Sequence, residues 1–224
     1  MKVADLYRTE LKHHGYEADP AQLAAAARLD ELRMELMSSV AGSNGLTRLL
    51  RRSPRRAAPA GGLYLWGSVG RGKTWLVDMF FQSLETPQRL RSHFHHFMRD
   101  VHAALRAQRQ QRDPLQHVAR ELSAQYRVIC LDELYVSDIA DAMILGTLFD
   151  ALLEAGTSLV ITSNCAPHGL YRDGLQRARF LPAIALLESR LVVHELTGST
   201  DYRLRALTRA PIYLSSAQPA HARE

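Results

Sequence analysis

The chain has 224 residues, 46% of them hydrophobic, and a formal net charge of +5, which fits one large globular domain or a domain with an appendage. No stretch approaches the ~18 uninterrupted apolar residues of a membrane span, and the polar start MKVADLYRTELKHH lacks the apolar centre of a signal peptide, so we expect a soluble, cytoplasmic protein. Two cysteines, Cys130 and Cys165, are too few for a disulfide framework.

The first 60 residues predict helices followed by a linker. The opening segment is helical, and a second helix begins at Asp19 and Pro20; this helix is too apolar on one side to be free in water, so we expect it to pack on the core. The stretch RLLRRSPRR that follows holds five arginines and no acid. Such a cluster is able to dock on phosphates of nucleic acid or anionic lipid, but the Pro, Gly and Ala around it favour a solvated linker.

The rest of the chain alternates strands and helices. Apolar runs predict strands at 63–66, 93–97, 126–133, 158–164 and 191–196, with helical segments between them. Five strands separated by helices predict an α/β fold, a parallel sheet with helices on both faces. We expect three parts: an N-terminal helical segment with the arginine-rich linker (1–60), a core (61–210) and a flexible tail (211–224).

A phosphate-binding loop follows the first strand of the core. GSVGRGKT, residues 67–74, matches the Walker A pattern G-x-x-x-x-G-K-[ST] between a strand and a helix, which is the context that a P-loop requires. Its glycines let backbone N–H groups face the phosphates; Lys73 places a charge on the β- and γ-phosphates, and the Thr74 hydroxyl is a ligand for Mg²⁺. The expected nucleotide-binding residues are Gly67, Ser68, Val69, Gly70, Arg71, Gly72, Lys73, Thr74 and Trp75.

Polar residues end two later strands. VICLDE, residues 128–133, ends in Asp132, which would hold Mg²⁺ directly or through water, and Glu133, which would orient and deprotonate a water for attack on the γ-phosphate. The alternative is a strand exit capped by surface acids. Asn164 follows the next strand, where its amide can contact the γ-phosphate or hold the attacking water. Asparagine is also an ordinary turn residue at such a position.

Two weaker patterns concern the base and a metal. HHGYEADPAQ is similar to the adenine-reading segment of certain helicases, which would make Gln22 a reader of the adenine edge, although the same residues fit a plain helix start. His93 and His95 would share one face of a strand and His96 the other, so we expect packing or partner contact from these histidines and no metal site.

The P-loop, the Asp-Glu pair and the strand-terminal Asn occur in the order and at the spacing of AAA+ ATPases. From about Tyr7 to Arg205 the chain resembles the ZapE cell-division ATPase family, which has mitochondrial relatives. The segments that carry the resemblance are GLYLWGSVGRGKTWLVDMF, SHFHHFM, DELYVSDIADAMILGTLFDALLEAG, TSNCAPHGLYRDGLQRARFLPAIALL and DYRLR.

This resemblance implies an AAA+ core that hydrolyses ATP with Mg²⁺, assembles as a homo-oligomer and acts on a protein partner. For bacterial members it implies association with the FtsZ ring at the inner membrane. Chains of the family continue beyond the last strand, whereas no helical lid is recognisable here. We therefore expect a chain that lacks its C-terminal portion.

An arginine-rich segment precedes the last helix. In YRDGLQRARFLPAIALL, residues 171–187, the R-x-R-F stretch lies where AAA+ rings place the arginine that reaches a neighbour's γ-phosphate. We favour Arg179 as this arginine finger over Arg177, with Arg172 third. The alternative is that all three are solvated residues of a helix face.

Two other functions remain open. A nucleic-acid-associated ATPase, such as a helicase loader, shares this core and would use the arginine-rich linker, but no aromatic and basic strand face for stacking bases is evident. We therefore do not expect nucleic acid as the partner. A nucleotide-gated scaffold with little hydrolysis is the other alternative.

Overall fold

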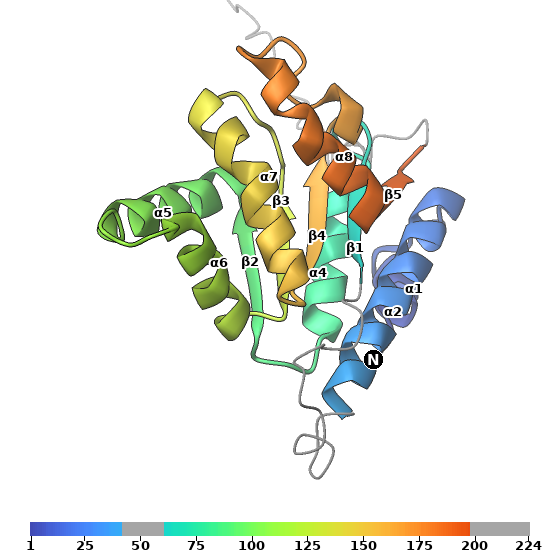
Figure 1. The fold of residues 1–224 in the computed structure, drawn as a ribbon. Coiled ribbons are helices and arrows are strands. Elements are labelled where there is room, and N and C mark those ends of the chain that lie inside the picture. Colours follow the sequence, from blue (N-terminus) through green and yellow to red (C-terminus); the bar gives the residue numbers. More distant parts are fainter. Residues whose placement is uncertain (42–60, 198–224) are drawn as a thin grey trace, which may run out of the picture.

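The structure, a computed structural model, describes residues 1–41 and 61–197. Its centre is a sheet of five parallel strands in the order β2-β3-β4-β1-β5 (Figure 1). The strands are β1 (Gly62–Trp66), β2 (Arg89–His93), β3 (Val128–Asp132), β4 (Ser158–Ser163) and β5 (Leu191–Glu195). The prediction of a five-stranded parallel sheet is confirmed.

The predicted second strand, residues 93–97, is wrong. Strand β2 ends at His93, and helix α5 (Phe94–Ala107) begins at the next residue. The apolar side chains of this region bury one helix face because they follow helical spacing; they are Phe94, Phe97, Met98 and Val101. The true strand, RLRSH, lacks an apolar pattern because it is an edge strand whose residues are mostly half-buried.

Side chains of the central strands alternate between the two faces of the sheet. Tyr64 belongs to one hydrophobic cluster, whereas its neighbours Leu63 and Leu65 belong to the other. Helix α5 covers the first face together with α6 (Pro114–Gln125), α7 (Ile139–Glu154) and α8 (Leu181–Arg190). The second face is covered by α1 (Val3–His14), α2 (Pro20–Ala41) and α4 (Lys73–Ser83). Helices on both faces are thus confirmed.

The two N-terminal helices form a hairpin against the core, beside β1 and α4 (Figure 1). Asp19 caps α2, since its carboxylate accepts from the backbone N–H groups of Ala21 (2.7 Å) and Gln22 (3.2 Å). Asp30 of α2 accepts from Val3 N–H (2.7 Å) at the start of α1. The predicted packing of the second helix on the core is therefore confirmed, and α1 packs there with it.

Several predictions fall on other parts of the chain. The arginine-rich stretch RLLRRSPRR, the DYRLR segment, the C-terminal tail and any helical lid lie outside the described residues. Within residues 1–41 and 61–197, no helix combines the length and apolar character needed to cross a lipid bilayer.

Candidate functional site

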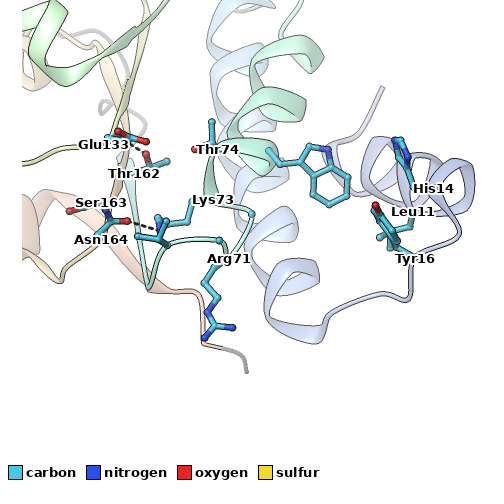
Figure 2. A pocket seen from close by; sticks show the side chains of 14 residues that line it. Leu11, His14, Tyr16, Arg71, Lys73, Thr74, Glu133, Thr162, Ser163 and Asn164 are labelled. Carbon is cyan, nitrogen blue, oxygen red and sulfur yellow. Dashed lines mark hydrogen bonds between the residues drawn. The ribbon is translucent and has the colours of Figure 1, made fainter. Parts of the chain in front are cut away.

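A cavity of about 480 Å³ opens at the carboxyl ends of the strands. Its walls come from loop residues 69–75, from Glu133 after β3, from residues 162–164 at the end of β4, and from Leu11, His14 and Tyr16 at the end of α1 (Figure 2). A volume of this size suits a small-molecule ligand, and the carboxyl edge of a parallel sheet is where such ligands bind.

The Walker A segment runs from β1 into α4. Gly70 and Gly72 both have φ of 82°, in the left-handed region that glycine adopts without steric cost. Gly67 (φ 152°) has no room for a side chain, because an added Cβ would lie 2.7 Å from the Leu196 carbonyl oxygen. The loop therefore reaches the start of α4, where unpaired backbone N–H groups favour an anion.

Lys73 is buried, with 8% of its surface exposed. Its ammonium donates to the carbonyls of Gly67 (2.7 Å) and Ser68 (2.9 Å) and to Oδ1 of Asn164 (3.1 Å). Burial lowers the pKa of Lys73, an effect that the carboxylate of Glu133 opposes. The structure thus brings Lys73 and Asn164, predicted separately, into direct contact at one wall of the pocket (Figure 2).

Glu133 lines the pocket in an unusual backbone conformation. Its φ is 57°, the left-handed region that non-glycine residues seldom occupy. Two hydrogen bonds to β4 hold this turn: Glu133 N–H donates to Oγ1 of Thr162 (3.0 Å), and Leu134 N–H donates to the Thr162 carbonyl (2.7 Å). The strained turn directs the chain out of β3 and leaves the Glu133 side chain exposed in the cavity.

Thr162 is a site residue that the sequence analysis missed. It is buried in β4, and its hydroxyl also approaches Oδ1 of Asp132 (3.4 Å). A single hydroxyl therefore contacts both residues of the Asp-Glu pair. The sequence feature that could have pointed to Thr162 is its hydroxyl side chain within the otherwise apolar strand SLVITS.

Asp132 is 3% exposed and does not line the cavity. Its Oδ2 accepts from Nε of Arg91 on β2 (2.7 Å), and Arg91 also pairs with Asp78 on α4. Burial by itself lowers the pKa of Arg91, but the hydrogen bonds that Arg91 donates to Asp132 and Asp78, together with their negative charges, prevail, and the pKa is raised. Arg91 was missed because nothing marks RLRSH as a strand beside β3.

The oxygen donors here fit the Mg²⁺ that the fold family implies. Thr74 and Glu133 expose a hydroxyl and a carboxylate in the same cavity, and hard oxygen ligands with retained water are what Mg²⁺ takes. Asp132 lies behind them, held by Arg91, so a water-mediated contact suits it better than direct ligation.

The far end of the pocket is apolar and aromatic. His14 and Tyr16 stack with ring centroids 5.5 Å apart and an interplanar angle of 19°. Leu11 lies beside them, opposite the Lys73 end (Figure 2), and Trp75 also lines the pocket. Such a lining suits the flat face of a purine base.

Gln22 does not line this pocket. It is fully buried; its Oε1 accepts from the Tyr7 hydroxyl (2.9 Å) and its Nε2 donates to the Arg71 carbonyl (2.9 Å). The amide faces the P-loop backbone from behind, so the interpretation of Gln22 as a base reader loses its geometric basis. Tyr16, from the same sequence segment, does line the pocket.

The candidate finger arginines are absent from the lining of this cavity. Arg177 and Arg179 lie in the short 3-10 helix η2 (Arg177–Arg179), just before α8. Nη2 of Arg177 donates to the His168 carbonyl (2.8 Å), whereas Arg179 and Arg172 are exposed. Which arginine serves a phosphate stays a prediction.

The histidines do not have the arrangement that the sequence suggested. His93 ends β2, and His95 and His96 lie in the first turn of α5, so the strand geometry assumed for them is wrong. Among the residues that the structure describes, no group of three or more His, Cys, Asp or Glu side chains is placed to hold a metal ion.

Comparisons with known proteins show the family of the chain. The family model for AFG1-like ATPases matches residues 1–224. The cell division protein ZapE of Escherichia coli K12 is 44% identical over 217 residues, which are 93% of this chain and 58% of that protein. Lactation elevated protein 1 homolog B of Danio rerio is 39% identical over 173 residues, 72% of this chain and 34% of that protein. The chain thus spans less than two thirds of either relative.

A solved structure shares the fold. AMPPCP-bound DnaA from Aquifex aeolicus matches with a TM-score of 0.54 and 14% sequence identity, over 86% of this chain and 52% of that chain. At this identity the likeness concerns the fold alone. It agrees with the five-stranded parallel sheet, and the predicted α/β fold is confirmed.

Proposed function

The chain belongs to the AFG1-like ATPase family. We propose that it binds ATP with Mg²⁺ in the cavity at the P-loop and hydrolyses the bond between the β- and γ-phosphates. One observation carries the proposal: Lys73, Glu133 and Asn164, which lie far apart in the sequence, line the same cavity of about 480 Å³. A positive charge, a carboxylate and an amide are the groups that phosphoryl transfer to water requires.

Each residue has a role in this proposal. The P-loop N–H groups and Lys73 bind the β- and γ-phosphates, which draws the ammonium from the carbonyls of Gly67 and Ser68. Glu133 accepts a proton from a water whose oxygen attacks the γ-phosphorus, while the bond from that phosphorus to the β-γ bridging oxygen breaks, giving ADP and phosphate. Asn164 orients the water or the γ-phosphate.

Thr74 and Asp132 would hold Mg²⁺, the latter through water. Bound there, the ion would supply positive charge against the charge that develops on the phosphates. The aromatic end formed by His14 and Tyr16 receives the adenine ring, and Trp75 lines the same pocket.

We also propose that the protein works as a homo-oligomer, with an arginine of one subunit completing the site of its neighbour. No arginine of η2 lines the cavity of its own chain, and Arg179 is exposed. The partner we propose, from the likeness to ZapE, is a protein of the division machinery such as FtsZ, reached in the cytoplasm with peripheral contact at the inner membrane. Co-sedimentation with FtsZ filaments, with and without ATP, tests this part; equal pelleting with and without filaments would contradict it.

Hydrolysis is tested by phosphate release from purified protein at saturating ATP, with Glu133→Gln as the control. The amide keeps the size of the side chain but cannot take the proton, so turnover should fall by about 10²-fold or more while affinity for ATP stays within a few-fold. Equal turnover by the two proteins would exclude Glu133 as the base. Binding without turnover by the wild type would point to a nucleotide-gated scaffold.

A further inference from the structure

Gln22 lies behind the P-loop and connects it to the N-terminal helix. Its side chain is fully buried, and it joins the Tyr7 hydroxyl on α1 to the backbone carbonyl of Arg71 in the loop, at 2.9 Å on each side. The two partners are 64 residues apart in the chain, since 71 − 7 = 64. A buried polar side chain that makes both contacts fixes their separation.

The loop is shaped around this amide. An added Cβ on Gly72 would lie 2.6 Å from Nε2 of Gln22, so a side chain there would displace the Gln22 amide, and Gly72 has a positive φ of 82°. The residue before the P-loop lysine therefore packs directly on the Gln22 amide. The glycine of the motif is needed here for its backbone conformation and for the space that Gln22 fills.

Tyr7 extends the connection toward the other end of the pocket. Its hydroxyl accepts from Asp19 N–H (3.0 Å), and its fully buried ring contacts that of Trp75, with centroids 5.4 Å apart. The helix that carries Tyr7 also supplies Leu11 and His14 to the base end of the cavity. One buried network thus contacts both walls of the nucleotide site.

We infer that Gln22 is a positioning residue for nucleotide binding, which holds the P-loop in its phosphate-accepting form and couples it through Tyr7 to the base-side wall on α1. This inference rests on the proposed function, because it takes a nucleotide as the ligand. Gln22 touches neither phosphate nor base. An ordered P-loop stabilises bound ATP and the transition state equally. Loss of the Gln22 amide therefore raises KM and Kd and leaves kcat nearly unchanged.

The test compares three variants of the whole chain by titration with Mg²⁺-ATP and Mg²⁺-ADP. Gln22→Met keeps the volume and removes both hydrogen bonds, and Tyr7→Phe keeps the ring contact with Trp75 and removes the hydroxyl. Thr157→Val is the matched control. It removes the hydrogen bond from the buried Thr157 hydroxyl to the Tyr126 carbonyl (3.0 Å), which lies at the amino ends of the strands, away from the pocket.

We expect Gln22→Met to raise Kd about tenfold and Tyr7→Phe about threefold, since each variant loses two hydrogen bonds and a single buried one is worth about 0.5–1.5 kcal/mol. Thr157→Val should lower Tm about as much as Gln22→Met does, but its Kd should equal that of the wild type. A purely structural role for Gln22 predicts the same behaviour as Thr157→Val, and a Kd within twofold of wild type for folded Gln22→Met would overturn the inference.

If Gln22→Met does not fold, Tyr7→Phe decides: a threefold rise in Kd supports the coupling, and an unchanged Kd overturns it. Failure of the proposed function looks different, since the wild-type protein itself would then bind neither nucleotide.

Discussion

The phosphate pocket and the arginine segment before α8 contain the same class of residue in opposite settings. In the pocket, Lys73 is 8% exposed and its three hydrogen bonds go to groups of its own chain. In the segment, Arg179 is exposed and contributes nothing to the lining of that pocket. Lys73 is buried with the pocket that it lines, whereas Arg179, the proposed finger, lies at the surface, where a second subunit can meet it.

Because of this difference in burial, we expect substitutions in the pocket and in the arginine segment to change different measured quantities. A substitution in the pocket leaves buried polar partners unsatisfied, so it changes nucleotide affinity or stability. A substitution at an exposed arginine leaves the fold and the chain's own pocket intact, so it changes turnover alone.

Arg179→Ala should reduce turnover by about 10³-fold or more, the contribution of an arginine finger, while Kd for ATP and Tm stay at wild-type values. Phosphate release and titration on the same preparation measure both quantities. Arg172→Ala, another exposed arginine of the segment, is the matched control and should lose far less turnover. Equal effects of the two variants would remove the special role of Arg179.

Lys73→Ala should weaken binding of Mg²⁺-ATP by about 10²-fold, because a charge-assisted contact between a buried ammonium and the phosphates is lost. Calorimetric titration gives the affinity directly. The fold should persist, since the carbonyls of Gly67 and Ser68 can turn to water in the opened pocket. Near wild-type affinity would show that the loop N–H groups alone hold the phosphates. The buried position of Lys73 would then have no consequence for nucleotide binding.

Thr162→Val should lower turnover about tenfold and stability by about 1–2 kcal/mol, because the Glu133 N–H loses its partner and the left-handed turn at Glu133 relaxes. Denaturant unfolding and phosphate release check the two effects. Thr157→Val again serves as control, since it should cost similar stability with full turnover. If both variants lose only stability, Thr162 has no positioning role.

Much of this site could be predicted from short-range sequence patterns. The P-loop, Glu133 and Asn164 each follow an apolar strand, so their place at the carboxyl edge of a parallel sheet follows from strand order alone. The second strand could not be predicted in the same way, because RLRSH has no apolar pattern and the neighbouring HFHHF, which has one, is the start of α5.

Contacts that depend on strand register could not be predicted from the sequence. Arg91 meets Asp132 only because β2 lies beside β3 with Arg91 opposite Cys130, two residues before Asp132. Thr162 meets Glu133 because β4 ends beside that turn. The sequence pattern singled out the segment that holds Gln22, but it assigned the amide to the adenine edge. Only the packing of α1 and α2 on α4 reveals that this amide faces the loop backbone.

In the proposed mechanism, one chain holds the nucleotide and another completes its site. This mechanism is tested most directly by mixing Lys73→Ala and Arg179→Ala subunits, each inactive alone, and measuring phosphate release from oligomers of verified mixed composition. Random head-to-tail assembly of equal amounts predicts recovery of roughly a quarter of wild-type turnover. A control mixture of Lys73→Ala with Glu133→Gln should recover nothing, because both lesions lie in the pocket. Background turnover in confirmed mixed oligomers of the first pair, or a protein that stays monomeric with ATP, would contradict the account.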